Sequence, residues 1–315
     1  MNTNVKQTLS GALLLVSALA ALFWANSPAE AGYEWIHQFK WLPAAVIFIF
    51  FATVGIELRQ ELSVGSLSQP RKAALPIAAA IGGMVVPALV FSLFNLQTGS
   101  LAGWAIPMST DIAFALAILA IFGKKLPKEM RAFLLTVAVV DDVLAILVIA
   151  VFYTSSFSLL SLASVIGVVV GLVVPRTIGH LLHIRLDTFN SLFGLPLFVL
   201  FEAGVHIAAD DQTAVLNSPV LYGIVAGLIL GNPAGVLLGT YIASSIAKSK
   251  VNWADLLPIA LLGGVGFTVA LLMNSLSFAQ GSLASASGTM GVIVGSAASA
   301  SLAIYAMQRK RTNVE

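Results

Sequence analysis

The stretch TVAVVDDVLAILVIA, residues 136–150, places two neighbouring carboxylates inside a run that is otherwise almost entirely apolar. Asp141 and Asp142 lie about ten residues into an apolar segment of residues 131–153, roughly 15 Å along a helix. An ionised aspartate at that depth of a membrane costs on the order of 2.5–3.5 kcal/mol. Such a cost is typical of a functional site, so we expect the pair to line a polar cavity.

The composition of the whole chain indicates a membrane protein. Of its 315 residues, 58% are hydrophobic and 10% are charged, with a mean hydropathy of +0.96. A soluble domain carries roughly 25% charged residues. The absence of cysteine excludes disulfides, thiolate metal sites and thiol nucleophiles. The net charge of +2 is too small to suggest a nucleic-acid partner.

Apolar runs long enough to cross a hydrocarbon core recur along the chain. We therefore expect an all-α polytopic membrane protein, in contact with membrane lipid, that forms a single integral membrane domain over residues 1–315. The first run could be a cleavable signal peptide, but the many later spans favour a retained helix. The ten predicted spans are residues 10–27, 43–62, 73–95, 104–122, 131–153, 158–174, 189–208, 219–246, 254–278 and 284–307.

The positions of Lys and Arg predict the orientation of these spans. Of the 16 basic residues, 15 fall on the side of the N-terminus, and only Lys40 falls on the other. The loops on that other side carry Glu30, Glu34, Asp210 and Asp211. Because basic residues concentrate in cytoplasmic loops, both termini are expected in the cytoplasm.

Two units, residues 73–153 and 219–307, are each predicted to contain three spans. The two units are expected to cross the membrane in opposite orientations. Inverted repeats of this kind occur in secondary transporters, whose sites lie where corresponding helices are broken. Helix breakers fall at matching places, as PMSTD at residues 107–111 and GGVGFT at residues 263–268. Non-helical backbone at this depth survives only inside protein or beside a wet cavity. The two breaks therefore predict an ion or solute site at mid-membrane.

The candidate site residues cluster around these breaks. Asp141 and Asp142 diverge by about 100° on a helix, so they can line a cavity and are expected to titrate as one coupled unit. A carboxylate that holds either a proton or a hard cation is the minimum requirement for cation/proton exchange. Thr110 offers a hydroxyl, and Asp111 offers a carboxylate at the start of a half-helix, where a structural cap is the alternative.

Other polar groups give weaker signals. Asn232 lies at the centre of its span and could donate to a buried carboxylate. Glu57 and Glu61 share a helix face and could form an acidic cytoplasmic mouth, with ordinary interfacial charge as the alternative. Glu202 and His206 share another predicted face, for which an interfacial polar patch is favoured. Glycines at positions 223, 227, 231, 235 and 239 predict a smooth face for helix packing.

Taken together, these stretches resemble the NhaA-type sodium/proton antiporters. They follow the family order through nearly the whole chain, and the TDIAFAL and VDD blocks are specific to the family. The main matches are VGIELRQELSVGSL (54–67), GWAIPMSTDIAFALAILAIFG (103–123), VAVVDDVLAILVIAVFYT (137–154), LPLFVLFEAGV (195–205), GIVAGLILGNPAG (223–235) and GGVGFTVALLMNSLSF (263–278).

The resemblance implies that Asp141 and Asp142 carry the transported cation and protons. It also implies that Thr110 and Asp111 lie where two unwound chains cross. Glu57 and Glu61 would belong to a cytoplasmic funnel and its pH response. Compensation of the broken helices would involve Gly264, Gly266, Thr268 and Asn232.

The activity implied is secondary antiport, which exports Na⁺ or Li⁺ in exchange for external H⁺ across a bacterial inner membrane. Such a protein is no enzyme, needs no resident cofactor, and regulates intracellular pH and sodium. An intramembrane aspartyl protease also needs two membrane carboxylates, but the Thr-Asp and Val-Asp-Asp contexts argue against it. A non-transporting member of the family is the other alternative.

The chain departs from the family pattern in three places. The family has twelve spans, and two of them are expected to be missing here after the VIGVVV segment. The family's lysine in a GKPLG segment is Asn232 in this chain. The loop between the first two spans lacks the long hairpin that the family uses for dimer contact, so a homodimer is possible but not implied.

Overall fold

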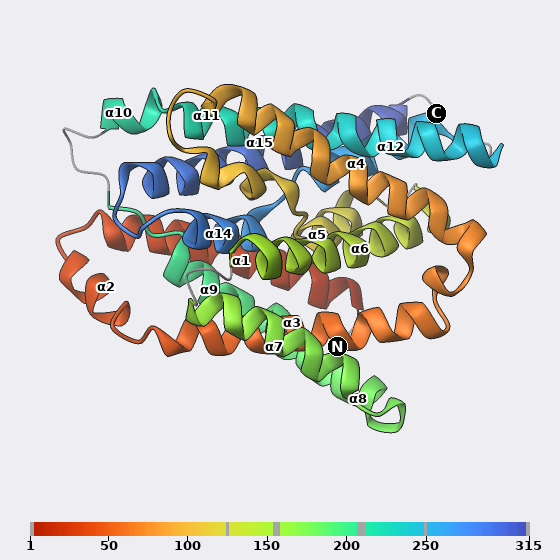
Figure 1. The fold of residues 1–315 in the computed structure, drawn as a ribbon, viewed down its shortest axis with the longest axis horizontal. Helices are drawn as coiled ribbons and strands as arrows, with labels where there is room; N and C mark the ends of the chain where they lie inside the picture. Colours follow the sequence, from red (N-terminus) through yellow and green to blue (C-terminus); the bar gives the residue numbers. More distant parts are fainter. Residues whose placement is uncertain (1–2, 124–125, 154–157, 207–211, 249–250, 313–315) are drawn as a thin grey trace.

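The computed structural model describes residues 3–123, 126–153, 158–206, 212–248 and 251–312, and within these ranges the chain is helical and contains no strand. Most of the long helices run along the longest axis of the molecule (Figure 1). The helices in the first half are α1 (Thr3–Ala25), α2 (Glu30–Ile36), α3 (Trp41–Ser63), η1 (Ser66–Ser68), α4 (Pro70–Asn95), η2 (Leu101–Met108), α5 (Ile112–Phe122) and α6 (Lys128–Phe152). Those in the second half are α7 (Leu159–Val173), α8 (Arg176–Phe189), η4 (Asn190–Gly194), α9 (Leu195–Glu202), α10 (Gln212–Leu216), α11 (Pro219–Ala226), η5 (Gly227–Gly231), α12 (Asn232–Ala247), α13 (Trp253–Gly263), α14 (Phe267–Ser277) and α15 (Leu283–Thr312).

The spans of the described chain agree with nine of the ten predicted ones. Eight segments are long and apolar enough to cross a membrane, among them the broken span Leu101–Phe122, and the bent pair α13–α14 gives a ninth. The span predicted at residues 189–208 begins earlier, as Thr177–Glu202. The segment predicted as residues 158–174 forms α7, whose 15 residues are fewer than the roughly 20 that a span needs. The structure thus has nine full-length spans and one shorter apolar helix, where ten full spans were expected. Since Gly167 lies at Phe48 and Gly171 at Ala52, α7 runs in the same direction as α3 and keeps the alternation of the ten predicted segments.

The short helix α7 packs along α3 through glycines. A Cβ on Gly171 would overlap the carbonyl oxygen of Ala52, and a Cβ on Gly167 would lie 2.5 Å from the carbonyl oxygen of Phe48. The two backbones are therefore in direct contact, which fixes α7 against a longer helix.

The glycine series of residues 223–239 packs against α4, as predicted. A Cβ on Gly235 would overlap the carbonyl oxygen of Gly82, and one on Gly239 would overlap that of Ala78. Residues four apart drift by about 40° around an α-helix at each step. The π-helical turn η5 lies in the middle of the series and takes more residues per turn. It therefore rotates the glycine face back toward α4.

The two ends of the bundle differ in charge. The end where α3, α12 and α15 finish carries Arg59, Lys248 and Arg309, and we call it the basic end. The opposite end contains α2 with Glu30 and Glu34, and we call it the acidic end. Other members of the predicted charge pattern, namely Lys124, Lys125, Lys250, Asp210 and Asp211, lie outside the described residues.

Candidate functional site

Two broken helices cross inside the bundle. One runs from η2 through extended residues 109–111 into α5, and the other runs from α13 through residues 264–266 into α14. The Asp111 amide donates to the Val265 carbonyl at 2.6 Å, and the Thr110 hydroxyl donates to the Gly263 carbonyl at 2.8 Å. Each break therefore satisfies backbone groups of the other, as irregular backbone inside a membrane protein requires.

The Asp111 carboxylate connects the starts of both following half-helices. As the N-cap of α5, it accepts a hydrogen bond from the Phe114 amide at 3.0 Å. Its second oxygen accepts from the Thr268 amide at 3.1 Å and from the Thr268 hydroxyl, at the start of α14. One carboxyl group thus lies at the positive ends of two helix dipoles, where a negative charge is favoured. The capping role that the sequence left as an alternative is present.

Gly264 and Gly266 allow the second break to approach its neighbours. A Cβ on Gly264 would overlap the carbonyl oxygen of Leu228, and a Cβ on Gly266 would lie 2.6 Å from the carbonyl oxygen of Ser109. Backbone atoms cannot move aside as a flexible side chain can. Neither position therefore has room for a side chain.

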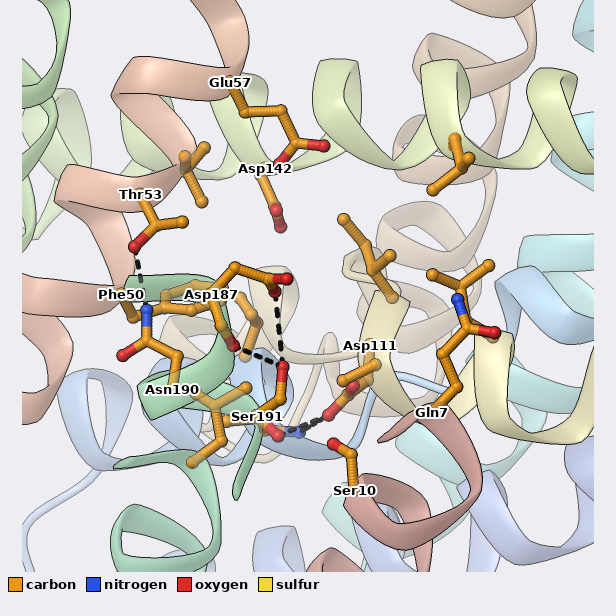
Figure 2. Close-up of a pocket in the computed structure, with 18 of the residues that line it drawn as sticks. Gln7, Ser10, Phe50, Thr53, Glu57, Asp111, Asp142, Asp187, Asn190 and Ser191 are labelled. Carbon is orange, nitrogen blue, oxygen red and sulfur yellow. Dashed lines mark hydrogen bonds between the residues drawn. The ribbon is translucent and has the colours of Figure 1, made fainter. Parts of the chain in front are cut away.

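The two aspartates of α6 have different surroundings. Asp141 accepts a hydrogen bond from the Thr110 amide at 2.8 Å, so it is attached to the first break. Asp142 is 2% exposed and makes no hydrogen bond with any residue in the described chain. It lines a cavity of about 270 Å³ instead, where Figure 2 shows it between Glu57 and Asp111. Of the pair, Asp142 is the one with oxygens available to a ligand.

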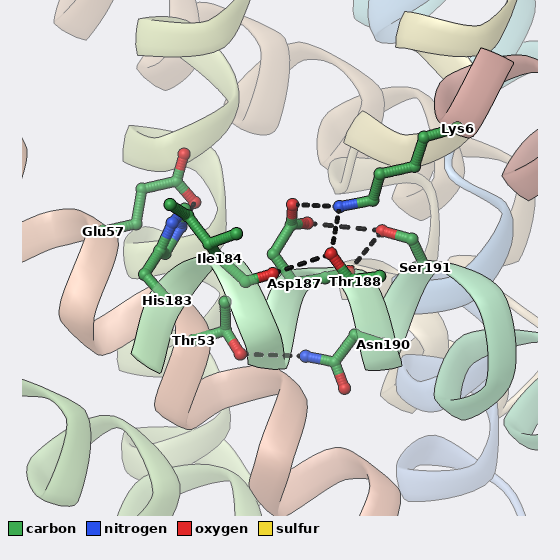
Figure 3. Close-up of polar contacts among 9 residues, drawn as sticks. All are labelled: Lys6, Thr53, Glu57, His183, Ile184, Asp187, Thr188, Asn190 and Ser191. Atoms are coloured by element: carbon green, nitrogen blue, oxygen red, sulfur yellow. Dashed lines mark hydrogen bonds and ion pairs between the residues drawn. The ribbon is translucent and has the colours of Figure 1, made fainter. Parts of the chain in front are cut away.

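The cavity extends from the crossing toward a charged rim. Thr110, Asp111 and Thr268 line its inner part together with Asp142. Its rim includes an ion pair between Lys6 Nζ and Asp187 Oδ2 at 2.6 Å, and Lys6 also donates to the Thr188 hydroxyl at 3.1 Å (Figure 3). The polar groups at the rim are Lys6, Glu57, His183 and Asp187.

The rim residues of α8 were not among the predicted site residues. The segment between the predicted spans 158–174 and 189–208 is a helix, and its His183 Nε2 lies 4.0 Å from Glu57 Oε2. His183, Asp187 and Ser191 recur every four residues and all line the cavity. That spacing was the available signal, because it places polar groups on one face of a helix.

Two predicted residues do not reach the cavity. Glu57 lines it but Glu61, one turn further along α3, does not, so only one of the two predicted acids lies at this mouth. Asn232 donates to the Gly83 carbonyl at 3.1 Å and not to a carboxylate, contrary to expectation. Its Oδ1 lies beside Gly263 at the end of α13 and has no hydrogen-bond partner among the described residues.

Glu202 and His206 also differ from the sequence prediction. Because α9 ends at Glu202, the two residues do not share a helix face, and that prediction is wrong. Glu202 accepts a hydrogen bond from the Ser275 hydroxyl, whereas His206 Nδ1 lies 2.9 Å from Glu30 Oε2.

Crossed, broken helices with buried carboxylates beside them define the class of secondary membrane transporters. Comparison with known proteins then gives the family. The profile of the family described as Na⁺/H⁺ antiporter 1 matches residues 2–181 and 163–307. The chain belongs to this family.

Individual relatives agree with the family match. The chain is 41% identical to the Na(+)/H(+) antiporter NhaA of Mycolicibacterium smegmatis, over 92% of this chain and 83% of the relative. It is 39% identical to the Na(+)/H(+) antiporter NhaA 1 of Kineococcus radiotolerans, over 97% and 88% respectively. It is also 37% identical to the Na(+)/H(+) antiporter NhaA 3 of Streptomyces coelicolor, over 94% and 77%.

The comparisons also agree with an internal loss of residues. The alignment with the Mycolicibacterium smegmatis relative runs over 357 positions, although this chain has 315 residues, so the relative carries residues that are missing here. The two matched segments of the family profile overlap at residues 163–181, which covers the junction of α7 and α8. This is where the sequence predicts that two spans are missing.

Proposed function

We propose that the protein exchanges cytoplasmic Na⁺ or Li⁺ for external H⁺ at the Asp142 cavity. The observation that carries the proposal is the state of Asp142, a deeply buried carboxylate that faces a cavity without a hydrogen-bond partner in the described chain. A buried charge with no partner is strongly destabilising. Asp142 therefore has reason to hold either a proton or a cation, and competition between the two couples their movements.

The surroundings of Asp142 suit a small hard cation, which prefers oxygen ligands. Thr110 and Asp111 line the same cavity, so hydroxyl and carboxylate oxygens are available next to Asp142. Asp141 participates indirectly, because its carboxylate holds the Thr110 amide. A change in the charge of the aspartate pair is thus transmitted to the first break.

The repeat units support alternating access to one site. The helix α4 of the unit 73–153 runs antiparallel to α11–η5–α12 of the unit 219–307, since residues 223 to 239 contact positions that descend from 95 to 78. The two breaks, one from each unit, meet at the interface between them. We infer that the units move relative to each other and expose the site to either side in turn.

The protein is a multi-pass membrane protein, for which we propose the bacterial inner membrane with both termini in the cytoplasm. The basic end would then face the cytoplasm, as the positive-inside bias expects. In that orientation, the charged rim formed by Lys6, Glu57 and Asp187 is the cytoplasmic mouth of the cavity. We propose that Glu57 acts there, while Glu61 influences the mouth only from outside it.

Proton movement driven by Na⁺ or Li⁺ in inside-out vesicles tests the proposal. Addition of either ion should dissipate a preformed pH gradient in vesicles with the parent chain and leave it intact with Asp142→Asn. Glu129→Gln is a matched control, because Glu129 is exposed at the start of α6. Equal responses from the parent chain and Asp142→Asn would remove Asp142 from the mechanism. No response from the parent chain would favour the non-transporting alternative.

A further inference from the structure

A second cavity, of about 350 Å³, lies at the acidic end of the bundle. Its walls come from α2, the end of α9 with the residues after it, the end of α14 and the start of α15. Among the described residues that line it, none is Lys or Arg. Its ionisable lining groups are Glu30, Tyr33, Glu34 and His37 on the α2 side, and Glu202 and His206 on the α9 side.

The carboxylate of Glu202 has a special position in this cavity. It stands at the last residue of an apolar span, is half-buried, and accepts a hydrogen bond from the Ser275 hydroxyl of α14. Glu30 has the imidazole of His206 as its partner, but Glu202 forms no ion pair within the described chain. A half-buried carboxylate at the end of a span, without a cationic partner among the described residues, is a candidate ion-binding group.

The histidines do not neutralise Glu202. Burial lowers the pKa of His37, although Glu34 acts in the opposite direction. A neutral His37 agrees with its contact, because its Nδ1 lies 2.9 Å from the Gln280 side-chain nitrogen and can accept a hydrogen bond from it. His206 faces Glu30 instead. The cavity therefore has a surplus of negative groups that attracts cations.

A second polar side chain in the cavity wall has one oxygen without a hydrogen-bond partner among the described residues. Asn274, next to Ser275 in the chain, is 2% exposed, and its amide nitrogen donates to the Ser285 carbonyl and the Thr289 hydroxyl, both at 3.0 Å. Its carbonyl oxygen has no hydrogen bond to a described residue. A buried polar atom left in this way is destabilising, and a bound cation or its water would offset that cost.

The half-helix α14 connects this cavity with the Asp142 cavity. At its start, Thr268 lines the Asp142 cavity and donates to Asp111. Seven residues further on, about 10 Å along the helix axis, Ser275 donates to Glu202. Hydroxyl groups at the two ends of one short helix therefore hold two carboxylates that face different cavities.

We propose that Glu202 is a second ion-binding carboxylate of the exchange path, which holds H⁺ or Na⁺ between the acidic-end solution and the Asp142 site. The inference rests on the proposed antiport function. No covalent bond changes in this step: Glu202 takes up a proton from the outer solution, passes it inward, and receives Na⁺ on its way out.

Access and binding can be measured without transport, because the chain has no cysteine of its own. Ala286 lines the acidic-end cavity and is half-buried, so Ala286→Cys introduces one small thiol there. We expect a membrane-impermeant maleimide to label it from the outer side of right-side-out vesicles. Na⁺ should slow the labelling at least about twofold with Glu202 present and have no effect in the Glu202→Gln background.

Exchange of Na⁺ for H⁺ is measured with the parent protein and the Glu202→Gln variant, both without the added cysteine. Glu202→Gln should lower the exchange rate by about tenfold, equivalent to 1.4 kcal/mol, and Glu202→Asp should recover part of it because the carboxylate is retained. Glu129→Gln serves again as the control of equal charge change. Thermal unfolding in detergent verifies that each variant is folded.

The outcomes separate this inference from the proposed function. Equal protection by Na⁺ in the parent and Glu202→Gln backgrounds, or none in either, overturns the Glu202 site. Loss of protection in Glu202→Gln, with no exchange by any chain, supports the site and overturns antiport. Full exchange by Glu202→Gln would show that ions bypass this carboxylate, and would overturn the inference while antiport stands.

Discussion

The two breaks that cross at the site are built from opposite kinds of residue. The first, residues 109–111, is Ser-Thr-Asp and supplies a hydroxyl, a carboxylate and an amide to the contact. The second, residues 264–266, is Gly-Val-Gly. The carbonyls of Val265 and of the preceding Gly263 accept hydrogen bonds, and Gly266 leaves space for the Ser109 backbone. The polar break donates hydrogen bonds to the backbone carbonyls that the glycine-rich break leaves without helical partners.

This division of labour follows from packing. Two chains with polar side chains could not approach closely enough for their backbones to pair. Two glycine-rich chains would leave carbonyl and amide groups without partners, which is costly in an apolar interior. The comparison predicts that small changes in the glycine break disturb the fold most, and that changes in the polar break act through single hydrogen bonds.

The largest effect is expected from Gly264→Ala. Its methyl group would overlap the carbonyl oxygen of Leu228 and the hydroxyl of Ser299. Overpacking of this kind costs about 3 kcal/mol or more when the neighbour is backbone, and exchange should be lost. Thermal unfolding in detergent measures the cost. Gly179→Ala is the control, since its nearest neighbour would be 3.7 Å away. An unchanged melting temperature for Gly264→Ala would mean that the second break can accommodate a methyl group, and would contradict the predicted overlap.

A smaller effect is expected from Asp111→Asn. The amide can accept from either Phe114 or Thr268 but not from both, so one half-helix start loses its cap. The expected cost is about 1–3 kcal/mol of unfolding free energy. Asp141→Asn is a suitable comparison, because its amide oxygen can still accept from the Thr110 amide. If both variants unfold alike, Asp111 is not the common cap that its contacts indicate.

Thr110→Val should cost about 1 kcal/mol, the usual contribution of one hydrogen bond. The substitution keeps the shape of the side chain but removes the donor to the Gly263 carbonyl. Thr110→Ser keeps the hydroxyl and should unfold close to the parent chain. Unfolding in detergent and the Na⁺ concentration for half-maximal exchange are both measurable. Equal values for Val and Ser would exclude a role for this hydroxyl.

The smallest effect, and the only one of opposite sign, is expected from Ser109→Ala. The Ser109 hydroxyl is buried and has no hydrogen-bond partner among the described residues. Its removal takes away a buried polar group without a partner in the described chain, so stability should be unchanged or higher by less than about 1 kcal/mol. Unfolding and exchange assays measure both properties. A weaker Na⁺ response from Ser109→Ala would instead assign this hydroxyl to the cation site.

The breaks and the aspartate pair could be predicted because their signals are local. Pro107, the glycines and charges inside apolar runs are each visible within a few residues. The rim could not be predicted in the same way, since Lys6 and Asp187 are 181 residues apart. Only the folded bundle brings α1 and α8 together.

Other errors came from where helices begin and end. The predicted face shared by Glu202 and His206 assumed a helix to residue 208, yet α9 ends at Glu202. Gly204 was the available stop signal, because glycine commonly follows a helix end. The amide of Asn232 was expected to face a carboxylate, but the close glycine contact with α4 places it against Gly83. Packing, which periodicity does not reveal, decided that partner.

The glycine contacts have a consequence for how the molecule can move. Where α4 meets α12, and where α3 meets α7, backbone touches backbone with no side chain between. Such contacts have no flexible side chains that could rearrange, so each helix pair should move as one rigid body. Relative motion of the two helix pairs must then occur at the interface between them. The helix α6, which carries the two aspartates, lies at this interface and contacts both α3 and α4. A shift of one helix pair relative to the other would change the side of the membrane to which Asp142 is accessible, while the packing within each pair stays the same.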